Sequence, residues 1–523
     1  MIRWSATFDQ DMSDLTLEEK LGQMLVAGFQ GHDAPPHIIE WLQEGRIGGV
    51  ILFARNIDTP AQLRALTQEL RQAAGRPILV AIDQEGGAVA RLREGFTESP
   101  GAMALGAADD PRLTGQVSHV LAAEMRAVGV NWNLAPAIDL THDIRNPSVG
   151  TRSLGSDPEH VTRHAVAQIK GLQEKGVAAT AKHFPGKANT PVDPHVDLPV
   201  IEGSLDEMWG TDLAPFRAAC AAGVSAVMVT HAQFKDIEPN YPSTMSSRII
   251  QGLLRERIGF TGLVTTDCME MKAITNRYGP GESAVLAAVA GADTILFSHT
   301  REWQEAAYEA LLEAARSGRL PPKRIDESTR RIEEVKARYA DLPRPPLSMI
   351  RRPKHLKTVE RAARAGVVLL RDDPGAIPLA RGGRCGLVEF ASQLERERLA
   401  GGAETALAAM LRERLPHLRS VWLDPADPTE AQLRGMDEVT GAVEAVIVAT
   451  RNAHLNKGQL EAVRRLRRLG VLVCLRNPYD AGVINAGSVL LTLGDSAPSL
   501  RAAADALVGA YVPTGRLNVP LTT

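Results

Sequence analysis

The sequence is short of cysteine and contains no CxxC pair. Its four cysteines, Cys220, Cys268, Cys385 and Cys474, are far apart in a chain of 523 residues and lie in or beside apolar runs such as VLVCL. Cysteines of this kind are usually buried free thiols. The sequence therefore predicts neither disulfides nor a cysteine zinc site.

Long apolar runs and an excess of charge of one sign are also missing. No stretch approaches the roughly 20 apolar residues of a membrane-spanning helix, and Arg3 is not followed by the apolar segment of a secretion signal. The 59 basic and 62 acidic residues give a net charge of −3, which attracts neither nucleic acid nor an anionic membrane. We expect a cytoplasmic protein that binds neither of them; the oligomeric state stays open.

The length of the chain indicates two domains, because 523 residues are more than one hydrophobic core usually holds. Up to about residue 340, amphipathic helical segments alternate with short β-branched runs, which is typical of βα units around a parallel sheet. Residues 341–358, DLPRPPLSMIRRPKHLKT, are rich in proline and basic residues and predict a linker. Residues 359–523 again alternate strands and helices, which predicts a smaller α/β layered domain.

The strands of the first domain can be assigned from their apolar runs. Thr16 and Glu19 form a capping box before KLGQMLVAGF, and Thr59-Pro60 begins a second helix. Seven strands are visible, whereas a closed barrel usually has eight. They are 48–53, 77–82, 130–135, 177–181, 225–230, 262–266 and 293–298. In the second domain the predicted strands are 366–370, 385–390, 445–450, 470–475 and 488–493.

Chargeable side chains follow four of these strands at the point where each strand ends. They are Asp83, Lys182-His183, His231 and Asp267. Functional groups of parallel α/β folds collect at the carboxyl ends of strands. The fold predicted for residues 1–340 is therefore an α/β fold, a (β/α)8 TIM-type barrel with its active site on that rim.

The segment 181–200, AKHFPGKANTPVDPHVDLPV, leaves its strand as a loop, because prolines and Gly186 interrupt regular structure. In this loop Asp193 can accept a hydrogen bond from one imidazole nitrogen of His195 and make the other nitrogen a better proton acceptor. That is a general acid/base arrangement, although an isolated D-x-H is more often a solvated loop pair. A metal site of His183, Asp193 and His195 is a third interpretation, for which Lys182 and the prolines make a poor ligand cage.

Asp267, in GFTGLVTTDCMEM (259–271), directly follows a buried strand, so its carboxylate is expected at the barrel mouth, where it can act as a nucleophile. The alternative is a cap for a helix beginning near Cys268. Glu270, three residues further on, is expected to reach back as a capping residue.

Two further segments carry groups suited to a sugar ring. In AIDQEGGAVARL (81–92), the Asp83 carboxylate can accept two hydroxyl hydrogen bonds, and Arg91 either binds substrate or pairs with Glu85. In NPSVGTRSLGSDP (146–158), Arg152 offers several fixed donors, with a buried salt bridge as its alternative role.

Together these segments resemble the KHFPGHG…DSH, nucleophile, D-(Q/R)-E-G-G and NP-x-(I/V)-x-x-R motifs of glycoside hydrolase family three, in its bacterial β-N-acetylglucosaminidase branch. The resemblance covers most of residues 17–300, and a closing VPTGRLNVPL resembles the end of the family's second domain. It implies Asp267 as the nucleophile and His195 with Asp193 as the acid/base. It also implies that the sugar is bound by Asp83, Arg91, Arg152, Lys182 and His183. It implies no metal and no cofactor, and His231 is expected to support the site from behind.

The chain departs from these motifs at two places. Lys187-Ala188-Asn189 replaces the usual His-Gly-Asp, and Pro194 replaces the Ser or Thr between the aspartate and the histidine. Because proline restricts the residue before it, the loop is expected to be stiffer than in relatives.

The resemblance implies a retaining hydrolase that removes terminal non-reducing β-linked N-acetylglucosamine, from cell-wall (muropeptide) fragments or chito-oligosaccharides. Three alternatives stay open: a β-N-acetylglucosaminide phosphorylase, a β-glucosidase or β-xylosidase of the same family, and a sugar-binding relative without catalysis. The D-x-H loop argues against the glucosidase, which normally takes its acid/base from the second domain. A histidine acid/base repels incoming phosphate less than a carboxylate does, so it leaves the phosphorylase open.

Overall fold

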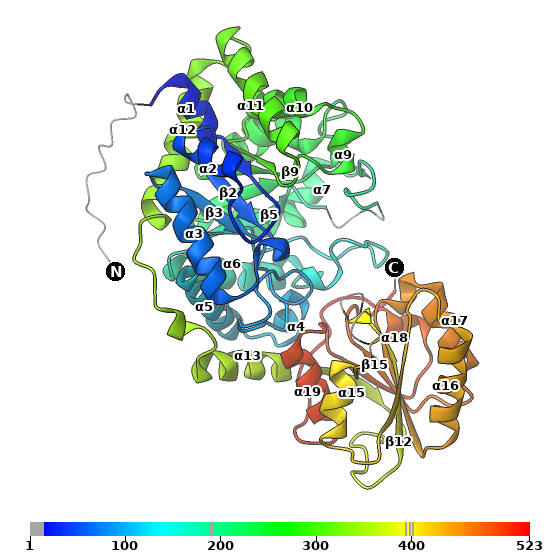
Figure 1. Cartoon of the computed structure of the whole chain (residues 1–523). Coiled ribbons are helices and arrows are strands. Elements are labelled where there is room, and N and C mark those ends of the chain that lie inside the picture. Colours follow the sequence, from blue (N-terminus) through cyan, green and yellow to red (C-terminus); the bar gives the residue numbers. More distant parts are fainter. Residues whose placement is uncertain are drawn as a thin grey trace.

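The computed structural model describes residues 15–187, 190, 192–392, 395–396, 399 and 402–522. It contains a barrel domain, coloured blue to green in Figure 1, and a sheet domain, coloured yellow to red. Within the described residues, no helix is both long and apolar enough to cross a bilayer. All four cysteines are free, and Cys385 and Cys474 are buried.

Eight parallel strands close the predicted barrel, in the order β1-β10-β9-β7-β5-β4-β3-β2. Their bounds are β1 Leu25–Ala27, β2 Gly49–Leu52, β3 Leu79–Ile82, β4 Trp132–Asn133, β5 Ala178–Phe184, β7 Ala226–Val229, β9 Leu263–Cys268 and β10 Thr294–Phe297. A small parallel pair, β6 Val200–Ile201 and β8 Gln233–Phe234, lies outside the barrel. The prediction of a (β/α)8-type barrel is confirmed.

The eighth strand lies in the segment that the sequence analysis assigned to the first helix. The capping box of Thr16 and Glu19 is present, but the helix ends at Gln23 and the next residues form β1. Val26 of β1 pairs with Gly49, and Leu25 pairs with Ile295, so β1 closes the barrel. Three apolar residues carry no periodicity of their own, and only pairing with both neighbours makes them a strand.

Helices surround the strands, and several begin with proline at the first turn, as in α3, α5 and α6. The helices of this domain are α1 Leu17–Gln23, α2 Pro36–Gln43, α3 Pro60–Ala74, α4 Ala102–Ala107, α5 Pro111–Ala127, α6 Pro158–Glu174, α7 Leu205–Gly210, α8 Leu213–Ala221, α9 Lys272–Thr275, α10 Pro280–Ala290, α11 Arg301–Arg316 and α12 Pro322–Tyr339, with a π-helical segment η5 Arg248–Arg257. The largest apolar cluster of the protein lies between these helices and the barrel.

The second domain is a six-stranded sheet in the order β11-β16-β15-β14-β12-β13. Its strands are β11 Val368–Asp372, β12 Cys385–Phe390, β13 Arg419–Leu423, β14 Ala445–Thr450, β15 Val471–Cys474 and β16 Ser488–Leu491. Its helices are α15 Ala406–Arg412, α16 Glu430–Gly441, α17 Lys457–Arg465, α18 Asp480–Val483 and α19 Ala497–Leu507. Only β11 is antiparallel to its neighbour. The edge strand β13 was not predicted, because its exposed first residues interrupt the apolar pattern.

Between the domains runs α13, Pro353–Gly366, which begins inside the segment predicted to be a linker. His355, Val359, Ala362 and Ala363 are buried at helical spacing, so the end of that segment is a packed helix rather than irregular chain. It contacts α4 and α5 of the barrel domain and α19 of the second domain. Backbone bonds from Gly515 to Val367 and from Arg516 to Ala107 add to this junction.

At the other end of the strands, a fully buried carboxylate joins the barrel to its helices. Asp293 accepts from Arg255 (2.6 Å), Arg324 (2.5 Å) and Arg331 (3.0 Å), and from the backbone N–H of Val264 (2.9 Å). Burial raises the pKa of Asp293, but the three guanidinium groups outweigh burial and hold it below its usual value.

We therefore expect Asp293→Asn to lower the free energy of unfolding by about 3–5 kcal/mol, because it leaves buried guanidinium groups without their counter-charge. Denaturant unfolding measures the change. The matched control is Asp326→Asn, whose half-exposed carboxylate pairs with Lys20 and should cost no more than about 1 kcal/mol. Equal effects for the two variants would contradict the role assigned to Asp293.

Candidate active site

Side chains from the ends of β3 and β5 meet at the barrel mouth, as the sequence analysis expected. Lys182 Nζ donates to Asp83 Oδ1 (2.8 Å), and Arg91 Nη2 donates to Asp83 Oδ2 (3.3 Å). Arg91 thus pairs with Asp83 and not with Glu85. The Nε of Arg91 is buried without a hydrogen-bond partner among the described residues.

Glu85 is the centre of a second set of buried contacts, which it makes with Arg152 and Lys182. It accepts from Arg152 Nη2 (2.8 Å) and Nε (2.9 Å), and it lies 2.7 Å from Lys182 Nζ. Burial raises the pKa of Glu85, but Arg152 and Lys182 lower it much further, so the carboxylate is ionised. The salt bridge that the sequence analysis weighed for Arg152 is present, and it fixes the guanidinium plane at the mouth.

His183 is held as a neutral imidazole. Its Nδ1 donates to Asp139 Oδ2 (2.7 Å), and its Nε2 faces Arg152 Nη2 at 3.3 Å. An arginine nitrogen can only donate, so Nε2 is the acceptor. Burial, together with Lys187, Arg152 and Lys182, lowers the pKa of His183 well below its usual value. Asp139, which follows β4, was not found from the sequence, where it lies in an apolar stretch beyond a predicted strand.

Asp267 lies at the end of β9 and is partly buried. Its Oδ1 accepts from the backbone N–H of Cys268 (2.8 Å). Burial raises the pKa of Asp267, but the positive charge of Lys187 and the hydrogen bond from Cys268 help to hold it far below its usual value. The carboxylate is therefore ionised, as a nucleophile requires.

The alternative role for Asp267, a helix cap, does not agree with the structure. Helix α9 begins only at Lys272, and its N-cap is Met271. Glu270 does not cap that helix either. It accepts from the backbone N–H groups of His299 (2.6 Å) and Thr300 (2.8 Å) just before α11, and from Sγ of Cys268 (3.9 Å). The sequence spacing suggested that Glu270 caps a helix close to it in the chain, whereas its carboxylate binds the loop that follows β10.

His231 supports the nucleophile strand, in agreement with the sequence analysis. Its Nε2 lies 2.9 Å from the carbonyl oxygen of Cys268, and its Nδ1 lies 2.6 Å from Thr244 Oγ1. A carbonyl only accepts, so Nε2 carries the proton. This bond holds the backbone directly after Asp267.

Lys187, the first of the departures from the resembled motif, is a buried cation at this site; Ala188 and Asn189 lie outside the described residues. Its side chain is 2% exposed, and its backbone N–H donates to Asp139 Oδ1 (3.0 Å). Its ammonium group makes no hydrogen bond or ion pair with the residues that the structure describes. Burial and the nearby Arg152 lower the pKa of Lys187 to about 8, against the opposite effect of Asp267.

The loop that carries the predicted acid/base is tied to the segment after β9. His195 Nδ1 lies 2.7 Å from Asp193 Oδ1, which also accepts the backbone N–H of His195 (2.9 Å). The carbonyl of Pro194 accepts from the backbone N–H of Ala273 (3.1 Å), and Arg277 pairs with Asp197 (2.9 Å). The imidazole of His195 is 66% exposed, so its Nε2 is open to solvent and ligand.

The loop that carries Asp193 and His195 interacts electrostatically with Lys187 and His231. The hydrogen bond from His195 lowers the pKa of Asp193, and Lys187 lowers it further. His195 in turn is among the groups that lower the pKa of the buried His231. Lys187 thus acts on both Asp267 and Asp193.

The second domain touches the segment that carries Arg152. Arg152 ends a short 3-10 helix, η3 Gly150–Arg152. A Cβ added to Gly150, whose φ is +43°, would lie 2.6 Å from Asn477 Oδ1 of the second domain. Glycine is therefore required both by the left-handed backbone and by the close approach of that domain.

Comparison with known proteins agrees with this arrangement. Residues 16–335 match the family described as glycosyl hydrolase family 3 N terminal domain. A β-hexosaminidase of Stenotrophomonas maltophilia (strain R551-3) is 37% identical over 289 residues, which cover 54% of this chain and 85% of the relative. β-Hexosaminidase A of Pseudoalteromonas piscicida is 28% identical over 538 residues, which cover 89% of this chain and 88% of the relative.

A solved structure resembles the chain over both domains. It is a glycoside hydrolase family 3 β-N-acetylglucosaminidase from Paenibacillus sp. str. FPU-7, with a TM-score of 0.90 and 36% identity, covering 97% of this chain and 99% of that one. Since the family match alone includes more than half of the residues, and the likeness extends through the second domain, the chain belongs to glycosyl hydrolase family 3 and is a glycosidase.

Proposed function

We propose that this protein is a retaining β-N-acetylglucosaminidase that removes terminal, non-reducing β-linked N-acetylglucosamine. Two groups support the proposal. One is the ionised carboxylate of Asp267 at the end of β9, and the other is the exposed imidazole of His195, whose Nδ1 is bound by Asp193. The names of the relatives, β-hexosaminidase and β-N-acetylglucosaminidase, support the sugar and the type of bond.

The proposed reaction has two steps. First, a carboxylate oxygen of Asp267 bonds to the anomeric carbon while Nε2–H of His195 gives its proton to the leaving oxygen, and the glycosidic C–O bond breaks. Next, Nε2 of His195 takes a proton from water, whose oxygen displaces Asp267 from that carbon. Two inversions retain the configuration. Asp193 stabilises the imidazolium form that donates in the first step.

The remaining side chains of the mouth bind the sugar in this proposal. The Asp83 carboxylate accepts from ring hydroxyls, with Lys182 and Arg91 as donors beside it. Arg152 offers donors at a fixed position, because Glu85 holds it from behind. His183, held by Asp139, lies beside the sugar and keeps Arg152 in place. These steps need no cofactor.

The natural substrate proposed is a cell-wall (muropeptide) fragment or a chito-oligosaccharide, since both end in β-linked N-acetylglucosamine. A role in recycling such fragments would place the protein in the cytoplasm. This part of the proposal is supported by the family branch alone.

A second candidate function is phosphorolysis, which one observation favours. The buried ammonium of Lys187 lies near Asp267 and has no anionic partner within bonding distance among the described residues. A phosphate that replaced water in the second step would find that positive charge. The product would then be the sugar 1-phosphate instead of the free sugar.

We expect Asp267→Ala and His195→Ala each to lower kcat/KM on nitrophenyl β-N-acetylglucosaminide by at least about 100-fold, since each removes a reacting group. Wild-type protein should prefer this substrate to the nitrophenyl β-glucoside. The control is His119→Ala, which removes a surface histidine paired with Glu174. Full activity of either variant, or a first product in the α configuration by NMR, would disprove the proposed mechanism. Sugar binding without turnover would identify a non-catalytic relative.

The pH profile tests the role of Lys187. Its positive charge lowers the pKa of Asp267, so Lys187→Met should raise that pKa. The acidic limb of the kcat/KM profile, where Asp267 becomes protonated, should move to higher pH by about one unit or more. The matched control is Lys354→Met, at an exposed position in α13. An acidic limb that stays in place would show that Lys187 does not act on the nucleophile.

Product analysis with phosphate present separates the two candidate functions. For the hydrolase we expect free N-acetylglucosamine as the product, and a rate that does not rise, when millimolar phosphate is added. Phosphate-dependent release of the 1-phosphate, lost in Lys187→Met, would establish the phosphorylase instead. Sulfate at the same ionic strength controls for salt effects.

A further inference from the structure

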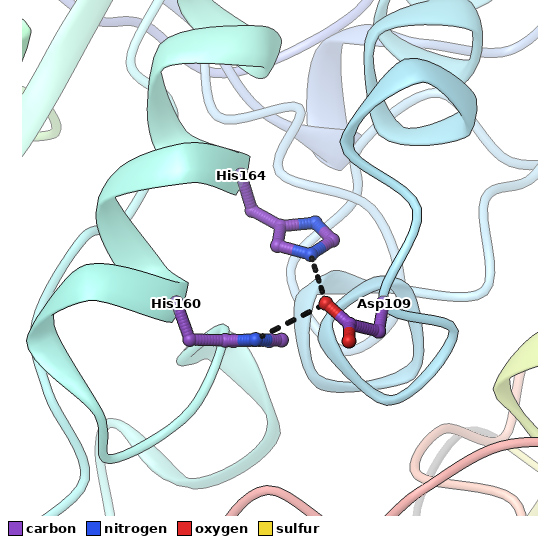
Figure 2. Close-up of side chains that lie close together, drawn as sticks. All are labelled: Asp109, His160 and His164. Carbon is purple, nitrogen blue, oxygen red and sulfur yellow. Dashed lines mark ion pairs between the residues drawn. The ribbon is translucent and has the colours of Figure 1, made fainter.

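A second group of ligand-type side chains lies in the helical layer outside the barrel strands. Asp109 comes from the turn between α4 and α5, and His160 and His164 come from α6. The two histidines are four residues apart, so both imidazoles lie on one face of the helix, with ring centroids 4.7 Å apart. Figure 2 shows both rings directed toward the Asp109 carboxylate.

The neighbours of His164 fit the tautomer that a metal ligand needs. Its Nδ1 lies 2.8 Å from Thr114 Oγ1, and that hydroxyl lies 3.2 Å from the carbonyl of Asp110. With the hydroxyl proton on the Asp110 carbonyl, Thr114 accepts from Nδ1–H of His164, and Nε2 carries a lone pair.

That lone pair has no hydrogen-bond partner. His164 is fully buried, and its Nε2 is without one among the described residues. The atom that it faces is Asp109 Oδ1, at 3.9 Å. Two electron-rich atoms that face each other in a buried place repel, unless a cation lies between them.

His160 directs its Nδ1 to the same carboxylate oxygen. The Nδ1 lies 3.5 Å from Asp109 Oδ1. Arg163 Nη2 lies 3.4 Å from this Nδ1 and 3.1 Å from Asp109 Oδ1. The three ligand atoms, Asp109 Oδ1, His160 Nδ1 and His164 Nε2, thus lie close together. One positive group, the half-exposed Arg163, lies beside them.

We propose that Asp109 Oδ1, His160 Nδ1 and His164 Nε2 bind a zinc ion, with water completing its coordination. Two neutral imidazoles and one carboxylate form a ligand set that zinc commonly takes. A tetrahedral zinc ion with bonds of about 2.0–2.2 Å holds its ligand atoms roughly 3.4 Å apart. The separations of 3.5 and 3.9 Å from Asp109 Oδ1 need only small adjustments to reach that geometry.

The place of the site in the fold indicates a structural role. Zinc would join the α4–α5 turn to α6, and His160 Nε2 lies 3.1 Å from Asn518 Nδ2 of the second domain. Asn518 also bonds to the carbonyl of Leu154, shortly after Arg152. The ion would stabilise the seam between the domains without touching the reacting groups, so this inference does not rest on the proposed glycosidase reaction.

The experiment is a calorimetric titration of the chelator-treated, dialysed full chain with ZnCl2, repeated with CoCl2 by visible absorption. All proteins carry His195→Ala, so that the Asp193–His195 pair does not compete for the metal. We expect one zinc per chain and a higher Tm with zinc. Asp109→Asn and His164→Ala should weaken binding at least about tenfold, since each removes a ligand. Arg163→Gln should strengthen binding by removing the competing cation.

The matched control is again His119→Ala, whose imidazole has a single carboxylate partner, Glu174, at 2.9 Å. It should bind zinc as the His195→Ala parent does. His164 is buried and its replacement can impair folding, whereas Asp109 is half-exposed, so Asp109→Asn tests the site in a folded protein. Undiminished zinc affinity in Asp109→Asn, or no zinc binding by the parent, would overturn the proposal.

Discussion

The negative charge of Asp267 is the feature on which the barrel mouth depends. An ionised carboxylate that is partly removed from water, as at the end of β9, raises the free energy of the folded state unless positive groups lie near it. The structure supplies Lys187 as an electrostatic partner, and His183 and His231 as polar neighbours held in fixed orientations. None of these groups forms a close ion pair with Asp267 that a substrate would have to break. The carboxylate is therefore ionised and still accessible to an anomeric carbon.

Two other cations of the mouth, Lys182 and Arg152, each contact more than one group. Lys182 lies between Asp83 and Glu85, and Arg152 is shared by Glu85 and the neutral His183. Such a network has little freedom to rearrange, because moving one side chain leaves another buried charge unpaired. The second domain adds to this rigidity through the close approach of Asn477 to Gly150. The groups proposed to bind the sugar are thus supported from both domains.

The sequence could predict the barrel, and it could propose the candidate site residues, because both leave local signals. Apolar runs followed directly by Asp83, His183 and Asp267 place polar groups at strand ends, and a D-x-H spacing puts a carboxylate within reach of an imidazole. It could not predict β1, which is three residues long, or the partner of Arg91, which proved to be Asp83. The target of Glu270 was also missed, because its carboxylate binds backbone groups 29 and 30 residues further along the chain.

The sequence by itself determined the family and the barrel, and it led to the proposed reacting groups, since strand-end positions and short motifs depend on residues close together in the chain. Only the tertiary structure decided which charges compensate one another. Lys187 appeared in the sequence as a departure from a motif, and its effect on Asp267 became visible once β5 and β9 lay in one barrel. Asp109 and the two histidines of α6 likewise carry no joint signal in the sequence. Burial and contact between distant segments set their electrostatics, and both arise only when the chain has folded.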